Sequence, residues 1–241
     1  MEVDGNVFEN ETAFDLLIRL GSEELLLTTS LPDLNPVIVL HPGKCYEING
    51  EIGVGKTQIC YSLATKLLLT KKKAKVGWIS AVPLRTDHLS LHFGVVDELL
   101  KEEMLERVVC KHVEKIAEFV DSLNHFLQMI SIQLIVVDDI DALLHDTVYS
   151  REEGRNVQLD VAEKLRKLAR LGSTVVVTNH ITHWRGYPAP ALGEFWTSQI
   201  TNRFYVEKEA DCSRVVSNMS GSNETTRSKF KIGAQGLESV D

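Results

Sequence analysis

Short apolar runs alternate with longer amphipathic stretches through the middle of the chain. Four runs are rich in apolar and β-branched residues and predict buried strands at 45–49, 76–80, 134–137 and 174–179. The stretches between them carry apolar residues at helical spacing and predict helices at 58–69, across most of 86–129, and at 156–171. This alternation predicts an α/β fold with a mostly parallel, twisted sheet flanked by helices. Ligands are expected beyond the carboxyl ends of its strands.

The two ends of the chain follow other patterns. Beyond residue 200, short strands are expected at 203–207, 213–217 and 229–232, separated by polar turns, and they predict an antiparallel C-terminal extension of the same sheet. Residues 1–42 are interpreted as a lead-in segment with a short helix at 13–20 and a proline-containing connection after it. Because no stretch resembles a linker between two domains, residues 43–241 are predicted to form one core.

The residues between the first predicted strand and helix carry the clearest chemical signal. They read Gly50-Glu51-Ile52-Gly53-Val54-Gly55-Lys56-Thr57, followed by Gln58, and fit the phosphate-binding pattern G-x-x-x-x-G-K-[ST] at every fixed position. Glycines let backbone N–H groups turn toward phosphate oxygens, and the following helix presents the positive end of its dipole. Lys56 is expected to reach the β- and γ-phosphates, and the Thr57 hydroxyl to bind magnesium. A glycine-rich turn that matches by chance is the alternative.

The strand predicted at 134–137 ends in two carboxylates, Asp138 and Asp139. An aspartate at the end of a buried strand, downstream of a phosphate loop, is the usual second half of a nucleotide site and holds magnesium directly or through water. Asp138 is assigned that role. The alternative is an aspartate that only caps a helix or lies in a loop.

Composition narrows the class of protein. The 241 residues suit one α/β domain, and the 44% of apolar residues suffice for a sizeable core. The net charge of −8 argues against a protein that coats nucleic acid through overall basicity, so such contact needs a local patch or a partner. The four cysteines show no metal-ligand spacing, and reduced thiols are expected. The acidic start does not read as a signal peptide, and no apolar run reaches the roughly 18 residues that cross a membrane.

Five segments together carry a family resemblance. They are the phosphate loop, the 134–138 strand, residues 175–179, residues 190–196 (Pro-Ala-Leu-Gly-Glu-Phe-Trp) and residues 201–203 (Thr-Asn-Arg). With them the chain resembles the RecA/RadA recombinase family, and most of all its eukaryotic Rad-fifty-one paralogues, over nearly its whole length. The resemblance implies a P-loop NTPase core of RecA type that binds ATP and Mg²⁺, with each ATP held between neighbouring subunits.

Two departures from the family pattern shape the expected function. Recombinases of this family carry an N-terminal helical DNA-binding domain for which this sequence has no room, which indicates an accessory paralogue. The resemblance also implies a catalytic Glu just after the strand next to the phosphate loop, but residues 78–83 read Trp-Ile-Ser-Ala-Val-Pro. A missing general base costs about 10²–10⁴ in rate, so nucleotide binding is expected to outlast hydrolysis. The alternative is weak turnover with Asp139 as a substitute base, because other P-loop ATPases place their catalytic acid there.

The resemblance also implies two DNA-binding loops, near residues 149–155 and 180–187. The candidate contacts are Arg151, Arg155, His183, Trp184, Arg185 and Tyr187. Cations mixed with aromatic rings let a single strand lie on a charged track and stack its bases. In the alternative, the aromatic residues pack on a partner or on the domain itself. Asn179 resembles a sensor residue, and His180 either reports the state of the γ-phosphate to the second loop or is simply a hydrogen-bonded histidine.

These inferences predict a nuclear, ATP-binding accessory factor of homologous recombination and DNA repair. The resemblance implies hetero-oligomers with other recombinase paralogues and with the main strand-exchange recombinase, which act on single-stranded DNA and stabilise recombinase filaments. Two alternatives stay open. One is an ATP-dependent protein-interaction switch without DNA contact, and the other is an active DNA-stimulated ATPase.

Overall fold

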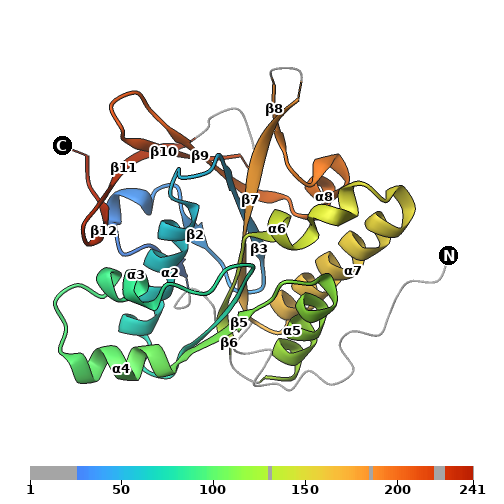
Figure 1. Ribbon diagram of the computed structural model, residues 1–241. Helices are drawn as coiled ribbons and strands as arrows, with labels where there is room; N and C mark the ends of the chain where they lie inside the picture. The colour runs from blue at the N-terminus through green and yellow to red at the C-terminus, as the bar shows by residue number, and fades with distance from the viewer. Residues whose placement is uncertain (1–25, 130–131, 185–186, 220–225, 241) are drawn as a thin grey trace.

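One large sheet organises the chain in the computed structural model, which describes residues 26–129, 132–184, 187–219 and 226–240 (Figure 1). Its strands follow the order β12-β11-β10-β9-β3-β7-β6-β4-β5, and β8 pairs only with β7. In chain order the strands of this sheet are β3 (Cys45–Gly50), β4 (Lys75–Ser80), β5 (Val108–His112), β6 (Ile132–Asp138), β7 (Thr174–Trp184), β8 (Tyr187–Pro190), β9 (Asn202–Lys208), β10 (Arg214–Asn218), β11 (Arg227–Gly233) and β12 (Gly236–Glu238).

The strand directions confirm the predicted fold class. Strands β5, β4, β6, β7, β3 and β9 pair in parallel, whereas β9, β10, β11 and β12 pair antiparallel. The C-terminal strands therefore extend the parallel sheet at one edge, as their pattern predicted. Before β3, the short strands β1 (Leu27–Thr28) and β2 (Val39–Leu40) form a separate antiparallel pair around the 3-10 helix η2 (Pro32–Leu34). The helix expected at 13–20 lies outside the described residues.

Helices cover both faces of the sheet (Figure 1). One layer contains α2 (Lys56–Thr70), α3 (Thr86–His92) and α4 (Glu98–Glu106), and the other contains α5 (Ile116–Gln128), α6 (Ile140–Leu144), the 3-10 helix η3 (His145–Val148), α7 (Arg151–Arg170) and α8 (Gly193–Gln199). Alternate residues of the central strands enter different cores, because successive strand side chains point to opposite faces. Val136 and Val176 pack with the first layer, while Ile135 and Val177 pack with the second.

Three segments differ from the sequence prediction. Residues 86–129 were expected to be mostly helical, but Val108–His112 form β5, which pairs in parallel with β4 at the edge of the sheet. Helix α7 begins at Arg151 and not at residue 156. Strand β7 continues beyond residue 179 to Trp184 and forms a hairpin with β8. The pairing of β5 with β4 involves a partner that is distant in sequence, and local spacing does not reveal such a partner.

Two further expectations concern the described residues. All four cysteines, Cys45, Cys60, Cys110 and Cys212, are free thiols, as predicted. Among the described residues, no helix is both long and apolar enough to span a membrane.

Candidate nucleotide site

The predicted phosphate loop connects the end of β3 to the start of α2, at the centre of the sheet. Gly55 caps α2 with a left-handed φ of 105°, and a Cβ atom there would lie 2.6 Å from Ile232 Cδ1. A Cβ atom on Gly50 would lie 2.4 Å from the carbonyl oxygen of Val206. Position 55 favours glycine because of its left-handed φ, and position 50 requires it because the backbone of β9 leaves no room for a side chain. The C-terminal extension thus shapes the loop.

Lys56 is folded back onto this loop and is only 6% exposed. Its Nζ donates hydrogen bonds to the carbonyl oxygens of Gly50 at 2.8 Å and Glu51 at 3.0 Å, and lies 2.9 Å from His180 Nδ1. Burial lowers the pKa of Lys56, and the nearby charge of Asp139 opposes this. The ammonium group is held at the loop by neutral acceptors, which phosphate oxygens could replace.

Thr57 and Asp138, the two predicted magnesium ligands, are in direct contact. The Thr57 hydroxyl donates to Asp138 Oδ2 at 2.9 Å, and the Thr178 hydroxyl donates to Asp138 Oδ1 at 2.6 Å. Burial raises the pKa of Asp138, and the two hydroxyl hydrogen bonds counteract part of this effect. A hydroxyl and a carboxylate side by side provide the hard oxygen ligands that Mg²⁺ prefers. These residues fit a magnesium ion, which would neutralise phosphate charge there.

His180 links the phosphate loop to a second pair of carboxylates. Its Nε2 lies 2.9 Å from Asp139 Oδ2, and Asp139 is close to Asp141 on the first turn of α6. Burial and the adjacent Asp139 raise the pKa of Asp141 to about 7. Burial opposes ionisation of Asp139, but hydrogen bonds from His180 and Asp141 lower its pKa overall. The hydrogen bond to Asp139 raises the pKa of His180.

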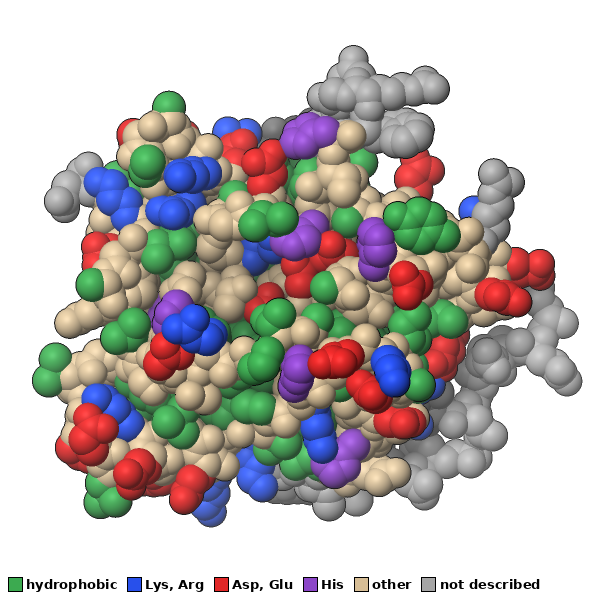
Figure 2. Space-filling view, in the orientation of Figure 1, with side chains coloured by type: hydrophobic (Ala, Val, Ile, Leu, Met, Phe, Trp, Pro, Cys, Tyr) green, Lys and Arg blue, Asp and Glu red, His purple; other side chains and the backbone are tan. Residues whose placement is uncertain are grey.

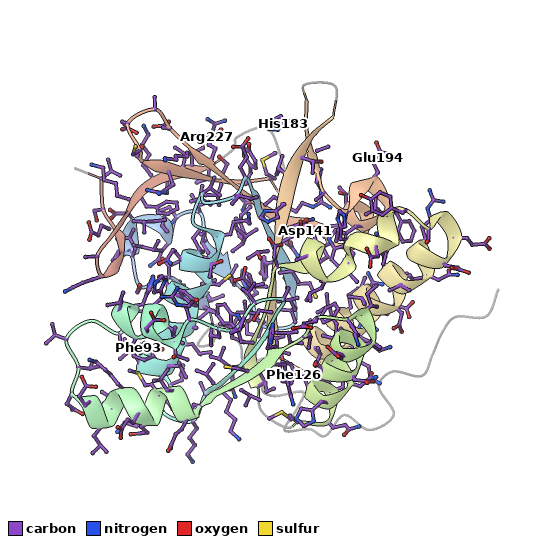
Figure 3. The ribbon with its side chains drawn as sticks, viewed as in Figure 1. Phe93, Phe126, Asp141, His183, Glu194 and Arg227 are labelled. Carbon is purple, nitrogen blue, oxygen red and sulfur yellow. The ribbon has the colours of Figure 1, made fainter. Side chains whose placement is uncertain are left out.

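Asp141 was not predicted as a site residue. The only sequence signal is its place two residues after the pair Asp138-Asp139, on the first turn of a helix that is too short to stand out as a pattern. In the structure Asp141 lies in the first turn of α6, which packs against β7 (Figure 3).

A small cavity lies where the family pattern places a catalytic carboxylate. It has a volume of about 170 Å³ and is lined by residues that include Thr57, Ser80, Val82, Arg85 and Asp138. Val82, which follows β4, is 65% exposed and offers no proton acceptor on its side chain. Arg85 Nη2 forms an ion pair with Asp87 Oδ2 at 2.7 Å. The cavity therefore leaves space for a reacting group beside Asp138, but residues 81–85, which follow β4, contain no carboxylate that could act as a base.

The segment predicted as the second DNA loop is a β-hairpin. Trp184 pairs with Tyr187 at its tip, and Thr182 pairs with Ala189. His183 belongs to the β7 strand of the hairpin, and its Nε2 lies 3.6 Å from Glu51 Oε1 of the phosphate loop (Figure 3). The side chains of Trp184 and Tyr187, and the whole of Arg185, lie outside the described part of the chain. His180 and His183 thus connect strand β7 to the phosphate loop.

The first predicted DNA loop is largely helical. Arg151 is the first residue of α7, so the prediction of a loop over 149–155 was wrong for residues 151–155. The Arg155 guanidinium carbon lies 5.6 Å from the ring centre of Phe195 and connects α7 to α8. In Figure 2, acidic, basic and histidine side chains are mixed over the face shown. A DNA contact on that face would depend on particular side chains and not on a broad positive field.

A buried carboxylate behind the loop was also missed by sequence reasoning. Glu47 on β3 is fully buried, and its Oε1 accepts hydrogen bonds from Asn179 Nδ2 at 2.8 Å and Trp196 Nε1 at 2.7 Å. Its Oε2 accepts from Asn49 Nδ2 at 3.1 Å and Arg203 Nε at 3.0 Å. The side chain of Asn179, the predicted sensor, therefore points into this cluster, and His180 faces the phosphate loop. The cluster joins β3, β7, β9 and α8.

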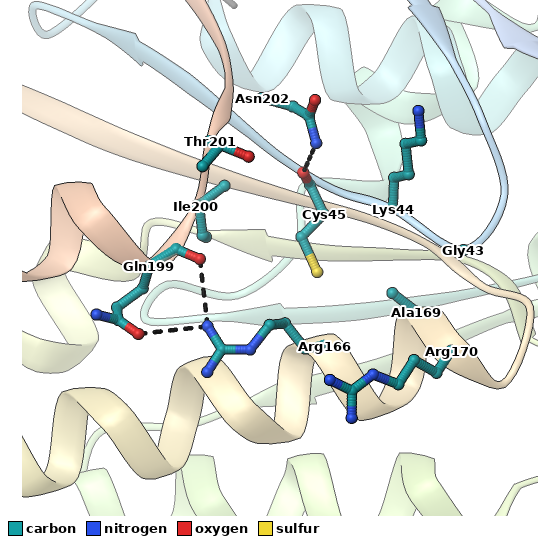
Figure 4. Close-up of a pocket in the computed structure, with 10 residues that line it drawn as sticks. All are labelled: Gly43, Lys44, Cys45, Arg166, Ala169, Arg170, Gln199, Ile200, Thr201 and Asn202. Carbon is teal, nitrogen blue, oxygen red and sulfur yellow. Dashed lines mark hydrogen bonds between the residues drawn. The ribbon is translucent and has the colours of Figure 1, made fainter. Parts of the chain in front are cut away.

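A second cavity, of about 280 Å³, lies at the opposite ends of these strands (Figure 4). It borders the start of β3 and the last turns of α7, and it includes the basic side chains Lys44, Arg166 and Arg170. Arg166 Nη1 donates to the carbonyl oxygen of Gln199 at 3.2 Å. This cavity is separate from the phosphate loop, which lies at the carboxyl end of β3, and it plays no part in the nucleotide site.

A glycine-rich loop follows the buried parallel strand β3, and Asp138, in the position of a magnesium-binding aspartate, ends the nearby strand β6. These features define a P-loop NTPase fold of RecA type. The sequence model of the Rad51 family matches residues 39–239, and the chain belongs to this family. It is similar to RAD51-like protein 1 of Caenorhabditis elegans, with 60% identity over 245 residues that cover 100% of both chains. The protein of the same name from Caenorhabditis briggsae is 61% identical over 236 residues, 97% of each chain.

More distant relatives include DNA repair proteins. DNA repair protein RAD51 homolog 4 of Mus musculus is 27% identical over 210 residues, which cover 80% of this chain and 64% of the mouse protein. DNA repair protein RAD51 of Saccharomyces cerevisiae is 28% identical over 185 residues, which cover 70% of this chain and 46% of the yeast protein. The expected resemblance to the Rad-fifty-one proteins is confirmed, and membership of this family supports a role in homologous recombination and DNA repair.

Proposed function

We propose that the chain is an ATP-binding accessory factor that stabilises recombinase filaments on single-stranded DNA during homologous recombination. It would act in the repair of double-strand breaks and stalled replication forks, in the nucleus, in a hetero-oligomer with other recombinase paralogues. One observation carries this proposal: the loop from Gly50 to Thr57 contacts both the magnesium-type residue Asp138 and, through His180, the hairpin where the family is expected to meet DNA.

The nucleotide would be held by residues that already converge on one point. Backbone N–H groups of residues 50–57 and the start of α2 favour phosphate oxygens. Lys56 would exchange its carbonyl acceptors at Gly50 and Glu51 for the β- and γ-phosphates. Thr57 and Asp138 would hold Mg²⁺, whose role is to neutralise the phosphate charge. Lys56 would then release His180, and because His180 lies on β7, ATP binding would be coupled to the hairpin.

Binding without rapid hydrolysis fits the residues around the phosphate loop. Val82 occupies the place expected for the catalytic carboxylate. Asp139, the possible substitute, is engaged by His180 at 2.9 Å and shares a buried environment with Asp141. A base that is already hydrogen-bonded is less able to orient a water molecule. ATP would therefore serve mainly as a clamp between subunits.

Two alternative functions are each supported by one observation. An ATP-dependent interaction switch without DNA contact is favoured by the net charge of −8, which repels nucleic acid. A DNA-stimulated ATPase is favoured by the proximity of Asp139 to Asp138 at the carboxyl end of β6. Partner binding that depends on ATP but is indifferent to DNA supports the switch, and turnover that rises with single-stranded DNA supports the ATPase.

The test of the accessory role measures recombinase filaments directly. The strand-exchange recombinase is assembled on fluorescent single-stranded DNA, and its dissociation is followed with and without this chain, its paralogue partners and ATP. The proposal predicts slower dissociation with the wild-type chain and no slowing with Lys56→Ala. Equal dissociation rates with and without the wild-type chain would contradict the accessory role.

A further inference from the structure

Three potential metal ligands converge at the edge of the nucleotide site, next to the predicted magnesium residues. Asp139, Asp141 and His180 each offer one ligand atom, and these atoms lie within 4.8 Å of one another. They come from the start of α6 and from β7. The predicted magnesium residues Thr57 and Asp138 do not belong to this cluster.

The two carboxylates of the cluster are incompletely satisfied. Asp141 is only 8% exposed, and its Oδ1 atom is buried without a hydrogen-bond partner. The Oδ1 atom of Asp139 is also buried and unpartnered. Buried carboxylate oxygens are rarely left without a proton, a donor or a metal, because each loses its hydration. The charge of Lys56 acts on Asp139, but its ammonium group contacts His180 rather than either carboxylate of the pair.

We propose that Asp139, Asp141 and His180 form a binding site for one divalent transition-metal ion such as Mn²⁺ or Zn²⁺. Asp139 Oδ2 and His180 Nε2 are 2.9 Å apart, which matches adjacent ligands around an ion with bonds of about 2.1 Å. Two carboxylates and an imidazole suit transition metals better than Mg²⁺, which prefers oxygen ligands alone. The free Oδ1 atoms leave each carboxylate able to bind through either oxygen.

Lys56 sets the condition for metal binding. Its ammonium group can only donate, so its hydrogen bond requires Nδ1 of His180 to be an acceptor and Nε2 to carry the proton. A metal at Nε2 displaces that proton and needs an N–H at Nδ1, directly beside the ammonium group. Lys56 must therefore turn away before the metal binds. A phosphate group at the loop would draw Lys56 away, so metal and nucleotide would favour each other's binding.

The experiment uses the full chain, freed of metal by a chelator and without nucleotide, titrated with Mn²⁺ while free Mn²⁺ is followed by electron paramagnetic resonance. We expect one Mn²⁺ per chain, displaced by Zn²⁺ and little affected by Mg²⁺. Asp141→Asn is expected to weaken binding at least tenfold. Asp146→Asn on the neighbouring η3 is the matched control, because Asp146 is exposed and lies outside the cluster. It is expected to bind like the wild type.

Mn²⁺ binding that is equally strong in Asp141→Asn, or absent from the wild type, overturns the proposal. In that case a proton shared between Asp139 and Asp141 would explain how the two carboxylates lie so close together. If Asp141→Asn fails to fold, Mn²⁺ broadening of the His180 ring signals in the wild type decides, and unbroadened signals overturn the site. Lys56→Ala is expected to bind Mn²⁺ at least threefold more tightly while losing nucleotide binding. The two sites are thereby distinguished, and weaker Mn²⁺ binding by Lys56→Ala contradicts the role assigned to Lys56.

Discussion

Replacement of Glu47 by glutamine tests how strongly the buried cluster behind the phosphate loop holds the sheet together. Glu47 is fully buried and accepts hydrogen bonds from Asn49, Asn179, Trp196 and Arg203. In Glu47→Gln one acceptor oxygen becomes an NH₂ group, so at least one of the four donors faces another donor. The negative charge opposite Arg203 is also lost. The variant keeps the size of the side chain, and any loss therefore reports on hydrogen bonding and charge.

The expected magnitude follows from burial. Removing one partner of a buried charge pair costs about 3–5 kcal/mol. Arg203 retains 22% side-chain exposure, so the charge term is partly screened and we expect the lower end, about 3 kcal/mol. For a domain of this size that corresponds to a fall in Tm of about 6–12 °C. The assay is urea unfolding at pH 7, followed by thermal unfolding of the same samples.

The matched control is Glu209→Gln. Glu209, in the turn after β9, pairs with Lys229 of β11, with side-chain exposures of 37% and 52%. An exposed pair of this kind contributes little to stability, because water screens both charges. The reasoning is refuted if Glu47→Gln is destabilised by less than about 1 kcal/mol, or if both variants lose the same amount.

Three further substitutions give independent predictions. Burial, and to a lesser extent the charge of His88, lowers the pKa of His92 from 6.5 to about 4. As the pH falls, His92 therefore takes up a proton in the unfolded chain before it does so in the folded protein. The protein should lose about 2 kcal/mol of stability between pH 7 and pH 5 for this reason. Urea unfolding of His92→Gln should lack that loss, and an unchanged pH slope would contradict the assignment. A Cβ atom on Gly154 would lie 1.8 Å from the carbonyl oxygen of Thr147, so Gly154→Ala should lose about 1–3 kcal/mol despite the better helix propensity of alanine; a variant as stable as the parent in urea would refute this. Val82→Glu supplies the absent carboxylate and should raise ATP turnover at least tenfold in a phosphate-release assay. Unchanged turnover with intact ATP binding would contradict the explanation that hydrolysis is slow because the catalytic carboxylate is missing.

Local sequence signals predicted the central architecture. The continuous apolar runs of β3, β4, β6 and β7 are buried on both faces of a parallel sheet, and this burial is what makes the runs visible in the sequence. The phosphate-loop pattern was visible in the sequence because it consists of neighbouring residues at fixed spacing, and its loop conformation between β3 and α2 agrees with that pattern. Thr57 and Asp138 were each assigned a magnesium role from the sequence, and their direct contact agrees with the rule that ligands bind beyond the carboxyl ends of parallel strands.

Long-range contacts account for most of what the sequence did not reveal. Val108–His112 lie between two helices, and their pairing with β4 gives no periodic signal of its own. The network around Glu47 depends on the register of β3, which places Glu47 directly opposite Arg203 of β9. Asp141 becomes noteworthy only because α6 packs beside β7 and brings it close to His180. Such juxtapositions depend on tertiary packing and not on spacing along the chain.

The measurement that tests the central claim most directly is Mg²⁺-dependent ATP binding and turnover by the purified chain. Both are measured with and without single-stranded DNA, beside a Lys56→Ala control of confirmed fold. We predict ATP binding that is lost in the control, together with turnover that stays low when DNA is added. A wild-type chain that does not bind ATP would contradict the proposed nucleotide clamp, and DNA-stimulated turnover lost in Lys56→Ala would replace it with a working ATPase.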